Sequence, residues 1–457
     1  MADTRKTQDY DPYVLTEKTI KEPPTHWLGR FRYLGPGLVL SASIVGSGEL
    51  IATTTLGAKA GFVTLWVILV SCIIKVALQL EFGKHVINTG ESNFASFNRL
   101  PGPKLGRANW TIWAWLLIMI LKFIQVGGIV GGVALTLNIA FPGVSVFIWV
   151  WLVALSVSLL IFRGYYQSIE KIALIMMGLF TILTLTCLAF VQFTEYAVSW
   201  ANILEGVKFD LPAAAVGVAI AAFGITGVGG DEIMCYNYWC IEKGYASFTG
   251  PKQNSPEWIR RAKGWIKVMY MDAFLSMVIY TVTTVAFYIL GAAVLHGRGE
   301  IPAGFQMIET LSRMYTETLG PWAKGIFLVG AFVVLYSTLF AGLAAWTRLF
   351  SDCFGQLGLI DFYDRKKRSK VIAILAFVIP IGWTLFFLFM KAPVFMVLLG
   401  GIGTSIMLLI VIFAAIHFRY RRLGEELKPG KFYDVWLWLS IVVIASVGVY
   451  GIVKLLL

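Results

Sequence analysis

Eleven long apolar runs dominate the sequence, and each is long enough to cross a lipid bilayer as a helix. A membrane helix needs about 20 mainly apolar residues, and only helices or closed barrels satisfy their backbone hydrogen bonds in lipid. The runs are too long for barrel strands, and only 14% of the 457 residues are charged, too few to cover a soluble protein of this length. We therefore predict an all-α polytopic membrane protein. The predicted spans are residues 35–60, 62–88, 108–137, 145–163, 169–193, 211–242, 265–295, 321–350, 371–390, 392–418 and 434–456.

Positive charge is divided unequally between the two sides that these spans define. The N-terminal segment and the connections on its side hold 29 Lys and Arg residues, whereas the opposite side holds 7. Because Lys and Arg concentrate in cytoplasmic loops, we expect residues 1–34 to be cytoplasmic and the C-terminus to lie outside, in a plasma membrane of bacterial type. The same asymmetry explains the net charge of +12, so no nucleic-acid partner is expected.

Two runs are interrupted near their middle by glycine-rich motifs that end in acidic residues. The first contains Val45-Gly46-Ser47-Gly48-Glu49, and the sixth contains Val228-Gly229-Gly230-Asp231-Glu232. The two motifs lie five spans apart, and because five is odd they enter the membrane in opposite directions. Interrupted helices at matching positions of an inverted repeat indicate a substrate site near the midplane. These glycines could instead serve close helix packing, but packing alone does not need neighbouring carboxylates.

Acidic and basic side chains inside the spans are the other informative feature. A carboxylate or ammonium at the bilayer centre costs about 2.5–3.5 kcal/mol on insertion scales and is functional by default. Glu49, Asp231 and Glu232 lie on the interruptions, whereas Lys75 and Lys122 lie inside spans 2 and 3. We therefore place the candidate site at the two interruptions.

Several motifs resemble those of the Nramp family of metal-ion transporters. Gly35-Pro36-Gly37 opens span 1 as in that family, and Gly46-Ser47-Gly48-Glu49 then falls on its Asp-Pro-Gly-Asn motif. In span 6, Gly229-Gly230-Asp231-Glu232 falls on the family's Met-Pro-His-Asn, and Asp272 in span 7 also matches. The resemblance implies a LeuT-like fold that transports divalent metal by alternating access. It implies two inverted five-helix repeats, at 35–195 and 208–418, and an eleventh helix at 434–456.

The chain departs from this family at the residues that bind metal and move protons. The family's ligating Asp and Asn are replaced by Gly46 and Glu49, and its Met ligand is replaced by Gly229. The neighbouring His is replaced by Asp231 and the second His by Tyr236, while the acidic pair of span 3 falls on Gln125 and Gly128. The resemblance therefore implies the scaffold but not the usual manganese or iron site, and it leaves proton coupling absent or rerouted.

The replaced site is expected to be a hard, all-oxygen one. Oxygen ligands suit Mg²⁺, Ca²⁺ or Mn²⁺, and we expect Glu49 and Glu232 to face one another across the pseudo-twofold axis. Glycines in place of larger residues predict a roomy pocket, able to hold a partly hydrated ion such as Mg²⁺. The divalent cation would be substrate, and no cofactor is expected. The predicted metal ligands are Glu49, Asp231 and Glu232, with Gly46, Thr226 and Gly229 also at the binding site; the coupling or ion-pair candidates are Lys75, Lys122, Gln125, Tyr236 and Asp272.

The two lysines leave alternatives open. Each could snorkel or pair with one of the carboxylates. Alternatively, Lys75 or Lys122 could act as a built-in cation, in place of a coupling ion or as a partner for an anionic group. In that case the substrate would be a small zwitterionic or anionic organic solute.

The sequence lacks the residue patterns that other classes of function would require. The four histidines do not cluster, no HExxH motif or Walker loop is present, and the five cysteines are interpreted as packing residues. A metalloenzyme and an ATP-driven pump are therefore not expected. Connections of about 20 to 30 residues at most argue against a sensor with a soluble output domain, and polarity confined to two breaks argues against a channel. We expect contacts with lipid and substrate, and no obligate protein partner.

Overall fold

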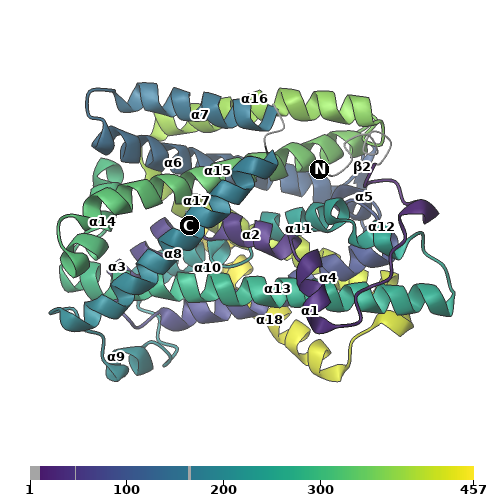
Figure 1. Ribbon diagram of the computed structural model, residues 1–457, viewed down its shortest axis with the longest axis horizontal. Helices are drawn as coiled ribbons and strands as arrows, with labels where there is room; N and C mark the ends of the chain where they lie inside the picture. Colours follow the sequence, from purple (N-terminus) through teal and green to yellow (C-terminus); the bar gives the residue numbers. More distant parts are fainter. Residues whose placement is uncertain (1–10, 47, 163–165, 457) are drawn as a thin grey trace.

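The computed structural model describes residues 11–46, 48–162 and 166–456, and its regular structure is almost entirely helical. Ser47, a member of the first glycine motif, lies outside the described residues. Each predicted span coincides with a helix or with two half-helices, and the long helices run along the longest dimension of the molecule (Figure 1). The unbroken spans are α4 (Leu65–Thr89), α6 (Trp110–Ala140), α7 (Val146–Phe162), α8 (Tyr166–Phe190), α13 (Pro256–Leu290), α15 (Ala323–Gln356), α16 (Arg365–Met390), α17 (Pro393–His417) and α18 (Lys431–Leu456).

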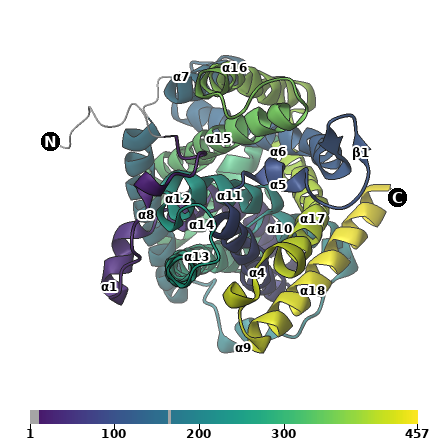
Figure 2. The same cartoon turned by 90° about the vertical axis from the view of Figure 1, so that its right-hand side faces the viewer.

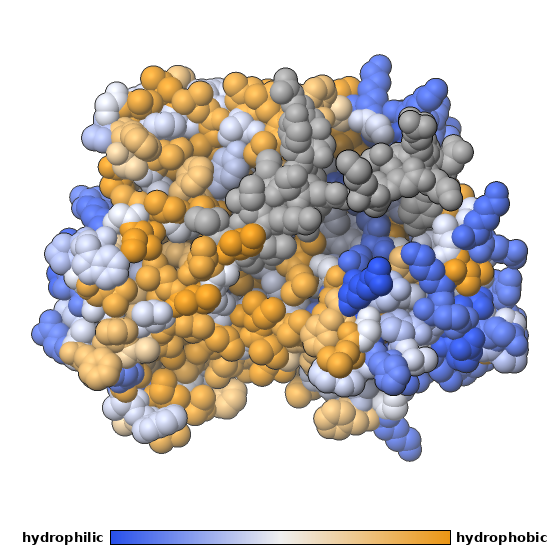
Figure 3. All heavy atoms as spheres, in the orientation of Figure 1, coloured by the Kyte–Doolittle hydropathy of each residue, from blue (hydrophilic) through white to orange (hydrophobic). Residues whose placement is uncertain are grey.

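Length and polarity identify a multi-pass membrane protein. In the described residues, eight helices are long and apolar enough to cross a membrane, and two shorter apolar helices cover Val146–Phe162 and Gly178–Phe193. Figure 3 shows a broad apolar band in the middle of the visible face, with hydrophilic residues gathered at its two ends. The helices therefore cross this band along the long axis of the molecule.

Both predicted breaks are present. Span 1 consists of α2 (Pro36–Ile44), the π-helical segment η3 (Gly48–Thr53) and α3 (Thr54–Ala60), and span 6 consists of α10 (Val216–Ile225) and α11 (Gly230–Lys243). After α10 the chain turns at Gly227, whose φ of +65° is left-handed. A Cβ at Gly227 would also lie 3.1 Å from the Cα of Cys72 on α4. Glycine is needed there because the break is both left-handed and close to a neighbouring helix.

The broken helices lie in the centre of the bundle. α2 contacts α13 and α15, and α11 contacts α4, α17 and α15. α10 packs along α17 and α4. Seen from the end of the bundle, α10 and α11 are enclosed, whereas α18 lies on the outside (Figure 2). This arrangement buries both breaks away from lipid, which is the condition under which interrupted backbone is tolerated in a membrane.

Hydropathy alone missed several polar or short elements. α13 begins at Pro256 instead of residue 265, because the Ser255 side chain caps it by accepting a hydrogen bond from the Trp258 amide. Its first turns are charged, so the apolar signal starts later than the helix. The remaining α-helices and strands are α1 (Trp27–Arg30), α5 (Asn93–Phe97), β1 (Lys104–Leu105), β2 (Ala108–Asn109), α9 (Trp200–Glu205), α12 (Tyr245–Thr249) and α14 (Met307–Leu319).

Candidate functional site

A small cavity of about 50 Å³ lies between the two broken helices and their neighbours α6 and α15. Four of the residues singled out from the sequence line it: Lys122, Gln125, Asp231 and Glu232. Organic-ligand pockets usually measure about 300–1,000 Å³, so this cavity has room for a few waters or one ion. The roomy pocket expected from the glycine substitutions is therefore not found in this conformation.

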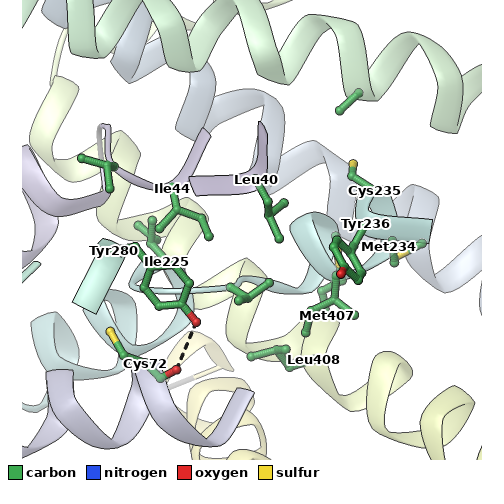
Figure 4. Close-up of a cluster of buried hydrophobic side chains, with 14 of the residues drawn as sticks. Leu40, Ile44, Cys72, Ile225, Met234, Cys235, Tyr236, Tyr280, Met407 and Leu408 are labelled. Carbon is green, nitrogen blue, oxygen red and sulfur yellow. Dashed lines mark hydrogen bonds between the residues drawn. The ribbon is translucent and has the colours of Figure 1, made fainter. Parts of the chain in front are cut away.

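The wall of the cavity is partly apolar. Leu40 and Ile44 of α2, Ile225 at the end of α10 and Cys235 of α11 contribute to it (Figure 4). Cys235 is fully buried with a free thiol, so one cysteine interpreted as a packing residue also reaches the site. Its position one helical turn after Asp231 could have drawn attention to it.

Lys122 forms the central ion pair of the site. Its Nζ lies 3.0 Å from Asp231 Oδ1, and it donates a hydrogen bond of 2.9 Å to Thr404 Oγ1 of α17. Both charged side chains are buried, with 2% and 8% of their surfaces exposed. Lys122 is thus placed in an ion pair, one of the alternatives considered for it, and Asp231 already has a cationic partner. Thr404 carries no sequence signal that distinguishes it from other polar residues of an apolar helix.

Asp231 and Glu232 lie in the first turn of α11, where the partial positive charge of the helix N-terminus favours carboxylates. The Glu232 side chain folds back over the start of its own helix, so that a Cβ at Gly229 would collide with its carboxylate. The room beside Gly229 is therefore filled by Glu232, and a larger residue there would have to displace this carboxylate.

Glu49 occupies the equivalent position at the first break and also folds back. Its Oε2 accepts a hydrogen bond of 3.2 Å from the Gly46 amide, and its Oε1 accepts one of 3.2 Å from Thr284 Oγ1 of α13. The side chain is fully buried and does not line the cavity. A glutamate that reaches back three residues to a backbone amide is the arrangement of a helix capping box.

The predicted metal cluster is not assembled in this conformation. Across the described residues, no group of three or more His, Cys, Asp or Glu side chains is arranged to hold a metal ion. The expectation that Glu49 and Glu232 face one another is wrong for this structure, because Glu49 is directed to Gly46 and Thr284. Of the three predicted ligands, Asp231 and Glu232 are together at the cavity and Glu49 is separate.

Backbone carbonyls at the two breaks are also engaged in hydrogen bonds. The Gly46 carbonyl accepts a hydrogen bond from the Leu50 amide, and the Thr226 carbonyl accepts hydrogen bonds from Lys75 Nζ (2.5 Å) and Ser71 Oγ (2.9 Å). Thr226 Oγ1 lies 3.0 Å from Thr53 Oγ1, which joins the two breaks directly. These two carbonyls are therefore satisfied by the protein itself.

Tyr236 and Asp272, two of the coupling candidates, are in contact outside the cavity. The Tyr236 hydroxyl donates to Asp272 Oδ2 at 3.3 Å. Asp272 also accepts hydrogen bonds from the amides of Gly35 (2.8 Å) and Gly37 (2.5 Å) at the start of α2. Its carboxylate thus caps the N-terminus of the first half-helix. Gln125 remains at the cavity, whereas Gly128 packs against α17.

Comparison with solved structures confirms the predicted LeuT-like fold. A mutant of the Eremococcus coleocola manganese transporter has a TM-score of 0.67 at 16% identity, over 96% of this chain and 90% of that one. MhsT in complex with L-phenylalanine has a TM-score of 0.57 at 14% identity, over 94% of this chain and 100% of that one.

Sequence comparison agrees with the family suggested by the motifs. An uncharacterised protein of Pasteurella multocida is 23% identical over 446 residues, which cover 94% of this chain and 93% of that protein. The sequence model of the family described as natural resistance-associated macrophage protein-like matches residues 37–454. Since that match covers nearly the whole chain, this protein belongs to the Nramp family.

Proposed function

We propose that this protein is a secondary transporter that moves a hard divalent metal ion, Mg²⁺ or Mn²⁺ with part of its hydration shell, by alternating access. The observation that carries the proposal is the cavity lined by Asp231 and Glu232 between the two broken helices. A site of this kind is where transporters of inverted-repeat architecture bind their substrates. Membership of the Nramp family, and the likeness to a structure titled a manganese transporter, support a metal ion.

The composition of the cavity favours a hard cation. Carboxylate oxygens of Asp231 and Glu232 and the side chain of Gln125 are available, and buried Gln125 Oε1 has no hydrogen-bond partner among the described residues. Oxygen ligands suit Mg²⁺ and Mn²⁺, and Mg²⁺ retains several waters when few protein ligands are present. About 50 Å³ suffices for such an ion with a few waters.

The ion pair between Lys122 and Asp231 sets a condition for binding. An incoming cation that uses Asp231 must share it with the Lys122 ammonium or displace that ammonium toward Thr404. Glu49 becomes a ligand only in a state in which it leaves Gly46 and Thr284. Binding is therefore expected to be coupled to movement at both breaks.

A second candidate substrate is a small zwitterionic solute. The observation that favours it is that Lys122 and Asp231 offer both signs of charge at one cavity. Such a solute could bind each of them, but the cavity would have to enlarge several-fold to hold an amino acid.

A binding screen on the purified protein separates these proposals. We expect Mg²⁺ or Mn²⁺ to raise the thermal unfolding midpoint, because a ligand that binds only the folded state stabilises it. Asp231→Asn should abolish the shift, whereas Glu309→Gln, on the exposed surface of α14, should retain it. A shift with amino acids or organic acids and none with divalent metals would contradict the proposal and favour the zwitterion.

A further inference from the structure

Lys75 on α4 lies at the carbonyl end of the first half of span 6. Its Nζ donates hydrogen bonds to the carbonyls of Phe223 (2.7 Å), Gly224 (3.4 Å) and Thr226 (2.5 Å). The last carbonyls of a helix have no partner within the helix, and α10 ends at Ile225. One ammonium group therefore satisfies the carbonyls that the break leaves free.

This environment is unusual for a lysine. Lys75 is fully buried, and within the described parts of the chain it forms no ion pair. Its contacts are backbone carbonyls and the ring face of Phe223, whose centroid is 5.3 Å from Nζ. Lys122, which also lies inside a span, instead faces a carboxylate at 3.0 Å. The two lysines thus occupy sites of different chemistry.

The carbonyl cluster has the chemistry of a site for a small monovalent cation. Carbonyl oxygens from an unwound helix, together with the negative end of the helix dipole, coordinate Na⁺ in transporters built from broken helices. Ser71, one turn before Lys75 on α4, donates to the same Phe223 and Thr226 carbonyls at 2.9 Å. The cluster is therefore a built arrangement shared by two side chains of one helix.

We propose that Lys75 is a tethered cation that permanently occupies a monovalent-cation site at the end of α10. The protein carries its own positive charge there, so substrate movement does not depend on a co-transported Na⁺ or K⁺ at this position. This inference deepens the proposed function, because it concerns how the substrate step is coupled. It stands on the geometry of the carbonyls, whichever substrate the cavity takes.

The test measures the response of folded protein to monovalent cations. Unfolding midpoints of wild type, Lys75→Ala and Ser71→Ala are compared in NaCl, KCl and N-methyl-D-glucamine chloride of equal ionic strength. We expect wild type and Ser71→Ala to show no difference between the salts. Lys75→Ala should unfold at lower temperature, and Na⁺ or K⁺ should restore about 3 °C or more, because the vacated carbonyls bind the ion.

A second measurement needs no variant. Wild-type unfolding and any substrate flux should be unchanged when Na⁺ and K⁺ are both replaced by N-methyl-D-glucamine. The proposal is overturned if folded Lys75→Ala shows no preference among the salts, or if the wild type itself requires Na⁺ or K⁺. If Lys75→Ala does not fold, the wild-type comparison decides. The midpoints are recorded without substrate, so they test the monovalent-cation site even if no divalent transport is found. Failure of this proposal and failure of the proposed function are therefore separate results.

Discussion

Lys122 and Asp231 are the residues on which the chemistry of the cavity depends most directly. They neutralise each other at 3.0 Å in a buried setting, where a charge without its partner is strongly unfavourable. A divalent ion at the cavity would supply Asp231 with a second source of positive charge. The stability of the pair and the binding of substrate should therefore be linked.

Removal of the lysine tests this link. We expect Lys122→Ala to lower the free energy of unfolding by about 3–5 kcal/mol, since it leaves Asp231 buried and unpaired. Added Mg²⁺ or Mn²⁺ should recover more stability in the variant than in the wild type, as measured by unfolding midpoints. Lys324→Ala, which breaks the exposed pair with Glu309, should cost less than about 1 kcal/mol and show no metal-dependent recovery. Equal metal responses in both variants would contradict the link.

The sequence allowed part of this site to be predicted. Asp231, Glu232 and Lys122 were identifiable because a charge in an apolar span is costly wherever it points. The direction of Glu49 was not, because it depends on Thr284 of a helix more than 200 residues away. Thr404 and Ser71 could not be found, since a hydroxyl in a membrane helix more often bonds to its own backbone.

At the scale of the elements, the ends of the broken helices meet side chains of complementary charge. Asp272 lies at the N-terminus of α2, Glu49 at the start of η3, and Asp231 in the first turn of α11, while Lys75 lies at the C-terminus of α10. Carboxylates at helix N-termini and an ammonium at a helix C-terminus all interact favourably with the helix dipole. The breaks are thus stabilised by charge.

Asp272 provides the test at this scale. Asp272→Asn should lower the free energy of unfolding by about 1–3 kcal/mol, because the carboxylate accepts two amide hydrogen bonds at a helix N-terminus. Tyr236→Phe removes the 3.3 Å hydrogen bond to Asp272 but leaves both amide hydrogen bonds of the carboxylate, and should cost about 0.5–1.5 kcal/mol. Denaturant unfolding in detergent measures both variants. A Tyr236→Phe effect as large as that of Asp272→Asn would show that the cap is not the main role of the carboxylate.

The positions of the breaks followed from their glycines and acids, but the partners of the broken ends did not. The carbonyls that bind Lys75 are about 150 residues away in the sequence, and backbone carbonyls leave no mark in a sequence. Short polar elements such as β1, β2 and α14 were missed because hydropathy reports only apolar length.

At the scale of the whole molecule, charged contacts outside the spans tie the connection after α4 to the segment that follows α17. Glu91, in the connection after α4, pairs with Arg422 at 2.7 Å beyond the end of α17, and also with Arg99. Burial opposes ionisation of Glu91, but the hydrogen bond from His85 and the charges of Arg422 and Arg99 prevail and lower its pKa from 4.5 to about 2.

This pKa predicts the pH dependence of stability. A carboxyl whose pKa is lowered by folding stabilises the folded protein at any pH above the ordinary pKa of the group. That contribution is lost as pH falls from about 4.5 to 2. We expect Glu91→Gln to be less stable than wild type by about 2–3 kcal/mol at neutral pH, with the difference vanishing toward pH 2. Unfolding midpoints across this range measure it. A difference that does not change with pH would exclude ionisation of Glu91 as its source.

The orientation of the molecule in the membrane remains a prediction that labelling can test. All five native cysteines are buried and free, so background reaction with a membrane-impermeant maleimide should be low. In intact cells, Arg298→Cys, beyond the end of α13, should react because that side is predicted to be external. Lys366→Cys, at the start of α16, should react only after the membrane is opened. The reverse pattern would invert the predicted orientation.

We propose that the cavity between the two broken helices binds the divalent metal ion that the protein carries across the membrane. Flux of Mg²⁺ and Mn²⁺ into proteoliposomes, followed with an ion-sensitive dye inside the vesicles, tests it most directly. We expect saturable uptake by wild type and by Glu309→Gln, and a loss of about tenfold or more for Asp231→Asn and Glu232→Gln. Absence of divalent uptake by folded wild type, or undiminished uptake by Asp231→Asn, would contradict it.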